Sequence, residues 1–171
     1  LANDTAAILA QRGVTSVTLD WRGTLFEGAS HLSSWDAQEV GAYEGEVGPM
    51  AIDAGRTYEG ANDFYSDSPA RVAQVFAQAL GAAGISATLG EAGEPPAGAA
   101  ALATVSSATM GEQLRWMLAH SDNTLADQYC RFAARAAGAP ATYEGATSTV
   151  ASTLSAAGVP TEGLFLEDCS G

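Results

Sequence analysis

Three stretches of the chain repeat one pattern of apolar and polar positions. "LAQRGV" (9–14), "LGAAGI" (80–85) and "LSAAGV" (154–159) each contain Leu-x-x-x-Gly followed by Val or Ile. The Leu ends an apolar helical stripe, and the Gly can adopt the left-handed conformation that terminates a helix. The β-branched residue that follows favours extended chain. The pattern predicts helices at about residues 3–12, 69–83 and 144–157, each leading into extended chain.

One extended stretch shows the alternation of a half-buried strand. Between residues 14 and 20, Val14, Ser16 and Thr18 alternate with Thr15, Val17 and Leu19. Further candidate strands lie at 48–55, 85–90, 101–107 and 164–168. The stretches 55–69 and 90–98 are rich in Gly and acidic residues and are predicted to be loops. Ser68, which precedes Pro69, is the expected N-cap of the next helix.

The chain becomes helical in character after Ser107. Thr109 and Glu112 have the spacing of a capping box. Two runs then carry apolar faces with helical spacing: Leu114, Met117 and Leu118 in the first, and Leu125, Tyr129, Phe132 and Ala136 in the second. The sequence predicts a mixed α/β fold with an α/β lobe at residues 1–107. The second domain, 108–171, would hold the helices of 108–158 and a terminal strand.

Charge and composition narrow the possible partners. The 171 residues include 20 acidic and 7 basic residues, a net charge of −13. Such a surface repels nucleic acid and anionic lipid, so neither is an expected partner. No apolar run is long enough to predict a membrane span. All basic residues are Arg, which excludes a Schiff-base lysine and any Ser-Lys catalytic pair within the chain.

The cysteines and histidines do not form a familiar metal pattern. Cys130 and Cys169 lie 39 positions apart, and His31 and His120 are isolated. No metal site or cofactor is predicted. The two cysteines fit either one disulfide or two buried thiols.

A polar triplet, Ser121-Asp122-Asn123, separates the two helical runs. Taken alone it is weak evidence of function, since such residues are common at helix joints and N-caps. Its apolar flanks, Met117-Leu118 and Leu125-Ala126, favour a rigidly held joint. Rigidity is what a catalytic Ser and Asn require.

The surrounding sequence adds a family resemblance. "MLAHSDNTLADQYCRFA" resembles the Ser-x-Asn helix junction of the D-alanyl-D-alanine carboxypeptidases in the class C, type-4-like penicillin-binding protein family. "ALATVSSATMGEQLRWML" is similar to the lead-in to that junction. "GATSTVASTLSAAGVPTEGLFLEDCSG" resembles the helix, turn and strand that follow it, and "LAQRGVTSVTLDWRGTLFEG" resembles the family's inserted lobe. The resemblance covers nearly the whole chain in order.

The chain also departs from the family pattern. The family's Ser-x-x-Lys nucleophile would lie before Leu1 and its Lys-Thr-Gly strand after Gly171, and the chain contains neither motif. The resemblance thus implies a central piece of the enzyme: an inserted α/β lobe and part of the helical region of a serine penicillin-binding, β-lactamase-like fold. By itself this piece is expected to be inactive.

The resemblance implies acyl transfer through a serine ester on peptidoglycan peptides that end in D-Ala-D-Ala. Ser121 would pass a proton toward the leaving amine, and Asn123 would bind the substrate amide and orient the lysine. Asp122 is expected to start the following helix. β-Lactams would acylate the same nucleophile, and the protein would act outside the cytoplasmic membrane.

Two other functions remain open from the sequence. One is a non-catalytic domain that binds cell-wall peptide or another protein, and the less favoured one is a serine β-lactamase. The resemblance also bears on the cysteines. It places the helix after Ser-x-Asn and the strand ending in Cys169 in one lobe, and the family commonly has Gly at the latter position. A Cys130–Cys169 disulfide is therefore slightly preferred over two buried thiols.

Overall fold

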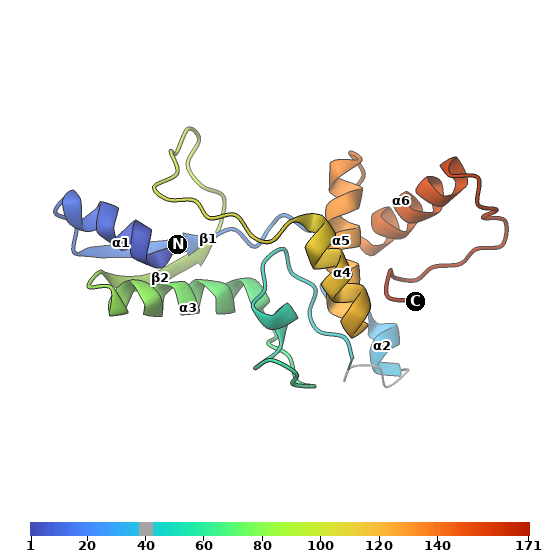
Figure 1. Cartoon of the computed structure of the whole chain (residues 1–171), viewed down its shortest axis with the longest axis horizontal. Coiled ribbons are helices and arrows are strands. Elements are labelled where there is room, and N and C mark those ends of the chain that lie inside the picture. The colour runs from blue at the N-terminus through green and yellow to red at the C-terminus, as the bar shows by residue number, and fades with distance from the viewer. Residues whose placement is uncertain (38–42) are drawn as a thin grey trace.

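The chain is elongated, with an α/β lobe at one end and a group of helices at the other (Figure 1). The computed structural model describes residues 1–37 and 43–171. The lobe consists of α1 (Ala2–Gln11), β1 (Ser16–Trp21), α3 (Ser68–Ala82) and β2 (Ser86–Ala92). The helical end consists of α4 (Met110–His120), α5 (Asn123–Ala136) and α6 (Tyr143–Ala156). The short helix α2 (Ser33–Ala37) and the 3₁₀ turn η1 (Asp53–Gly55) lie in the intervening segments.

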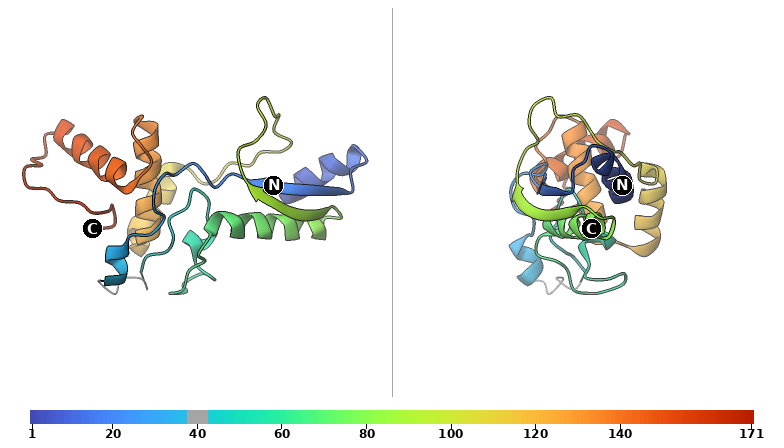
Figure 2. Two further views of the ribbon diagram at one scale, coloured as in Figure 1. Left: turned by 180° about the vertical axis from the view of Figure 1, so that it is seen from behind. Right: turned by 90° about the vertical axis from the view of Figure 1, so that its left-hand side faces the viewer.

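The two strands of the lobe form a parallel pair. Ser16 lies opposite Ser86 and Leu19 opposite Leu89, with an irregularity between Leu19 and Trp21. The predicted alternation is confirmed, because Val17 and Leu19 are half-buried whereas the residues between them are exposed. The lobe core contains Ala6, Leu9, Leu80 and Ile85, and partly buried Val17 and Ala87 of the strands pack against it. Figure 2 shows α1 and α3 beside this ribbon from two further directions.

The three predicted helix ends are confirmed. Gly13, Gly84 and Gly158 have φ values of 71°, 89° and 83°. After each Gly, the next amide donates to the carbonyl of the Leu five residues before it, at 3.0, 3.0 and 2.9 Å. This is the hydrogen-bond pattern of a Schellman motif, which satisfies the last helical carbonyls. The capping box of Thr109 and Glu112 is also present.

Three of the predicted strands are wrong. Within the described residues, 48–55 contains bends and η1, and neither 101–107 nor 164–168 has strand structure. An extended segment becomes a strand only when a neighbour takes up its amides and carbonyls, and none of these three segments is paired in this way within the described part of the chain. The N-cap prediction is wrong by one residue: Asp67 accepts the Ala70 amide at 2.9 Å, and Ser68 is the first helical residue.

The two helical runs do not bury the faces that their apolar spacing predicts. Leu118 is 75% exposed, and α4 has no fully buried residue. On α5 the buried residues are Thr124, Asp127, Gln128, Cys130, Arg131 and Ala134. Of the predicted apolar face of α5, Tyr129, Phe132 and Ala136 line a cavity of about 1000 Å³ beside α4. Apolar periodicity identifies the stripe, but the neighbours of the helix decide which face is covered.

A buried arginine joins α5 to the segments around it. Arg131 is 1% exposed, and its guanidinium donates to the carbonyls of Glu27, Ala29 and Ala141. It also lies over the rings of Phe26 and Tyr143, with 4.8 and 4.7 Å to the centroids. Every face of the cation therefore has a partner, which offsets the cost of removing it from water.

A disulfide joins α5 to the C-terminal segment. The Cα atoms of Cys130 and Cys169 are 6.3 Å apart, and the two residues are bonded, in line with the preferred expectation. Ala134 and Ala146 form a small core with Cys130. Figure 1 shows the segment after α6 returning toward α5. The division into domains at residue 107 stays a prediction.

Replacing Arg131 with Ala should lower the free energy of unfolding by about 3–5 kcal/mol, because one buried and two partly buried hydrogen bonds to carbonyls are lost. Arg135 lies one turn later on the same helix and is exposed, so Arg135→Ala should change stability by less than about 0.5 kcal/mol. Chemical denaturation of both variants is the measurement. Equal stability of the two variants would contradict a structural role for the buried guanidinium.

The denatured, unreduced protein should contain no free thiol by thiol titration. The bridge spans 39 positions, so its loss in Cys130→Ser/Cys169→Ser should cost about 3–4 kcal/mol by the chain-entropy estimate. Two free thiols per chain in freshly prepared protein would contradict the bridge.

Candidate functional site

The Ser-Asp-Asn triplet forms a tight turn between α4 and α5. Ser121 ends α4 in the left-handed conformation, at φ 51° and ψ 51°. Asp122 is the N-cap of α5, which confirms its expected helix-start role, and Asn123 is the first helical residue. Ser121 is exposed and Asn123 half-buried. Among residues 1–37 and 43–171, neither side chain has a hydrogen-bond partner, so both can contact a ligand.

The middle residue anchors the turn through both carboxylate oxygens. One oxygen of Asp122 accepts the Leu125 amide at 2.9 Å. The other accepts Arg56 Nη1 at 2.6 Å, and these two side chains are 3% and 17% exposed. This ion pair connects the motif to the segment between β1 and α3. It is shielded from water and so is stronger than a surface pair.

The segment of residues 44–48 runs beside the first half of α5. The amide of Gly45 donates to Thr124 Oγ1 at 2.9 Å, and the Gln128 amide nitrogen donates to the Gly48 carbonyl at 2.7 Å. A Cβ on Gly45 would lie 2.3 Å from the Phe64 ring, so the backbone approaches that ring closely. The helix that begins at Asn123 is therefore held along its side as well as at its end.

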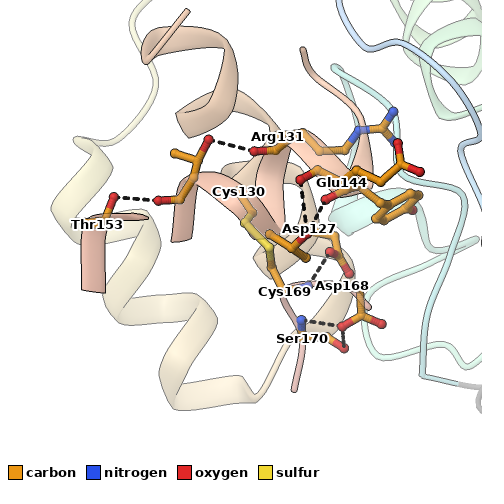
Figure 3. The surroundings of a disulfide bond; sticks show 12 residues. Asp127, Cys130, Arg131, Glu144, Thr153, Asp168, Cys169 and Ser170 are labelled. Carbon is orange, nitrogen blue, oxygen red and sulfur yellow. Dashed lines mark hydrogen bonds between the residues drawn. A yellow bond between two sulfur atoms is a disulfide. The ribbon is translucent and has the colours of Figure 1, made fainter. Parts of the chain in front are cut away.

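Two carboxyl groups are buried together behind the motif. Glu44 is 3% exposed and Asp127 is fully buried. Asp127 accepts the Cys169 amide at 2.9 Å, and Figure 3 shows its side chain directed at that segment. Burial, with a smaller contribution from the charge of Asp127, raises the pKa of Glu44 to about 9. Burial also raises the pKa of Asp127 to about 6, against hydrogen bonds from Cys169 and Glu44 that lower it. Glu44 therefore keeps its proton and donates it to Asp127.

A cavity of about 530 Å³ opens beside the motif. Its lining includes Arg56 and Asp122 of the buried ion pair, together with Trp116 and His120 on the last turns of α4. The Trp116 and His120 rings are stacked at 4.1 Å. Within the described residues, no group of three or more His, Cys, Asp or Glu could hold a metal ion. In the same residues, no helix is long and apolar enough to cross a membrane.

Sequence reasoning missed Arg56, Glu44 and the buried role of Asp127. Arg56 lies in a Gly-rich loop, 66 residues from its partner, and nothing in the sequence identifies that partner. Asp127 and Arg131 are four residues apart, a spacing typical of exposed helical ion pairs. One signal in the sequence could have indicated that both are buried: they lie on the same helical face as Cys130, and cysteine is usually buried.

Glu44→Gln should make the stability of the chain less dependent on pH. The raised pKa values mean that the folded chain binds protons more tightly than the unfolded chain, so this contribution is present at low pH. It is lost as pH rises from the ordinary value of 4.5 toward about 9. Thermal midpoints across this range should fall more steeply for wild type than for Glu44→Gln, and the curves should converge at acid pH. Glu144→Gln, at an exposed position, is the control, and parallel curves for wild type and Glu44→Gln would contradict the shared proton.

Comparison with known proteins gives one family match and two similar proteins. The profile of the D-Ala-D-Ala carboxypeptidase 3 (S13) family matches residues 63–171. The carboxypeptidase DacB of Mycolicibacterium smegmatis is 33% identical over 174 residues, which cover 99% of this chain and 37% of that protein. The carboxypeptidase Rv3627c of Mycobacterium tuberculosis is 33% identical over 168 residues, which cover 95% of this chain and 35% of that protein. No solved structure matches significantly.

The chain therefore spans little more than a third of the length of these two relatives. The family match includes the whole Ser-Asp-Asn turn, with Asp122 of the buried ion pair, and both cysteines of the disulfide. It begins seven residues after Arg56, so it does not include that residue. Because the family profile matches more than half of the residues, the chain belongs to the D-Ala-D-Ala carboxypeptidase 3 (S13) family.

Proposed function

We propose that this chain carries the Ser-x-Asn element of a serine-type D-Ala-D-Ala carboxypeptidase or endopeptidase. The observation that supports the proposal best is the turn itself. Ser121 and Asn123 present side chains without partners in the described residues, two positions apart on a backbone fixed by a buried ion pair. Such a preformed arrangement is what acyl transfer needs from residues that position a substrate. Family membership and the names of both relatives agree with this function.

The reaction proceeds through an acyl-enzyme. A serine hydroxyl attacks the carbonyl of the penultimate D-Ala, the bond to the terminal D-Ala breaks, and water later hydrolyses the ester. Ser121 Oγ transfers the proton that the leaving amine acquires. The Asn123 carboxamide, which both donates and accepts, holds the substrate amide and orients the lysine that activates the nucleophile. Because the chain contains no lysine, the Ser-x-x-Lys pair comes from outside these 171 residues.

The substrate class follows from the same chemistry. The enzyme cleaves peptidoglycan stem peptides outside the cytoplasmic membrane, and β-lactams acylate the same nucleophile because they mimic the terminal dipeptide. In this arrangement, residues 1–107 form a lobe inserted into a penicillin-binding domain, and 108–171 form part of that domain. The strong negative charge of the chain agrees with a substrate other than a polyanion.

Ser121→Ala and Asn123→Ala should slow acylation of the full-length gene product by a fluorescent penicillin. The expected loss is about 10²–10⁴-fold for Ser121, as for a proton-transfer group, and about 10²–10³-fold for Asn123, as for an electrostatic donor. Thermal midpoints should change little, because neither side chain bonds to the described protein. Ser155→Ala and Asn3→Ala, at exposed positions, are matched controls.

The isolated 171 residues provide the complementary test. They should form no covalent penicillin adduct, since the nucleophile pair lies elsewhere. Stoichiometric labelling of the isolated chain would show that the chemistry is misplaced. Wild-type acylation rates in both motif variants would reduce the turn to a helix joint and favour a non-catalytic binding domain.

A further inference from the structure

We propose that Arg56 is a positioning residue that acts on Ser121 and Asn123 through Asp122. The structural part of the proposal stands on the ion pair, and its effect on the reaction rests on the proposed function. Arg56 comes from the segment between β1 and α3, so the position of the motif depends on how that segment is folded.

The turn depends on the Asp122 carboxylate. Asp122 is 4% exposed, and its two oxygens are shared between the Leu125 amide and Arg56. Without the guanidinium, a buried carboxylate loses its counter-charge, which is costly. The carboxylate can then recover water only by rotating away from the helix end, which also removes the N-cap.

Ser121 has few restraints of its own. Its side chain is exposed, and its left-handed conformation costs a non-Gly residue about 1–2 kcal/mol. What holds it there is the backbone on either side: the end of α4, where the Asp122 amide donates to the Met117 carbonyl at 3.1 Å, and the cap of α5. Loss of the cap would therefore release both Ser121 and Asn123.

Arg56 is itself held by a rigid local frame. The backbone of Arg56 pairs with that of Phe64 in an isolated antiparallel bridge, and the Arg56 guanidinium lies 5.0 Å from the centroid of the Phe64 ring. Its amide donates to the Asp53 carbonyl at 3.1 Å. Asp53 and Ala54 both have positive φ, 51° and 54°. Two consecutive non-Gly residues in this region are strained, and this strained turn directs the following Arg56 toward the motif.

The test measures acylation by a fluorescent penicillin in the full-length gene product, with Arg56→Gln and Arg56→Lys. Arg71→Gln is the matched control, since Arg71 also stacks on an aromatic ring, Tyr65 at 4.9 Å, but has no acidic partner among the described residues. The rate constant should fall about 10–100-fold in Arg56→Gln, because displacements near 1 Å cost about that much. The final labelled fraction should stay at the wild-type level. Arg56→Lys should recover part of the rate, and Arg71→Gln all of it.

Amide hydrogen exchange at Leu125 measures how firmly the Asp122 cap is held, and this measurement does not depend on activity. Exchange should be faster in Arg56→Gln than in wild type or Arg71→Gln, because the cap at Asp122 is lost. A wild-type acylation rate in Arg56→Gln would overturn the proposal, as would a lower labelled fraction at an unchanged rate constant, which indicates only misfolding. If the wild-type protein is not acylated at all, the proposed function fails, and exchange alone decides: faster exchange supports the anchor, and unchanged exchange overturns it.

Discussion

The fold depends on the burial of polar groups on one helix. Most of the buried side chains of α5 are polar or charged, and each of the central ones has partners from distant segments. Arg131 is the clearest case, because its guanidinium binds one carbonyl in the loop that precedes α6 and two in the segment that follows β1. Of the two small cores around it, one contains Cys130, Ala134 and Ala146, and the other contains Trp35, Val47 and Tyr143. Neither core is large, so the hydrogen bonds contribute strongly to how these segments are arranged.

The same helix connects the elements of the candidate site. Its first residues form the motif turn, its middle holds the shared proton of Glu44 and Asp127, and Cys130 bonds it to the C-terminal segment (Figure 3). A substitution at any of these points therefore affects the same helix of 14 residues. The acidic pair and the Arg56–Asp122 pair lie on segments that approach α5 from the same stretch of chain, residues 44–56. The position of the motif therefore reflects interactions well beyond the turn.

The sequence predicted what is locally encoded. The Leu-x-x-x-Gly ends were found because the Gly conformation and the hydrogen bond back to Leu involve six consecutive residues. The Ser121–Asn123 turn and the Asp122 cap were found for the same reason. The strands at 101–107 and 164–168 were not, because pairing depends on a second segment that no local pattern describes. Arg56 and Glu44 escaped prediction since their partners lie 66 and 83 residues away (127 − 44 = 83). The buried face of α5 was misjudged because burial depends on neighbours.

The backbone at position 121 carries an energetic cost. A left-handed helix end is most easily occupied by Gly, and any side chain there lowers stability slightly. The space around Ser121 is open, so folding alone gives no reason to prefer a hydroxyl to a hydrogen atom. Drift toward greater stability would favour Gly at this position. Ser121 therefore occupies a position whose backbone conformation suits Gly better, and folding alone does not account for its hydroxyl group.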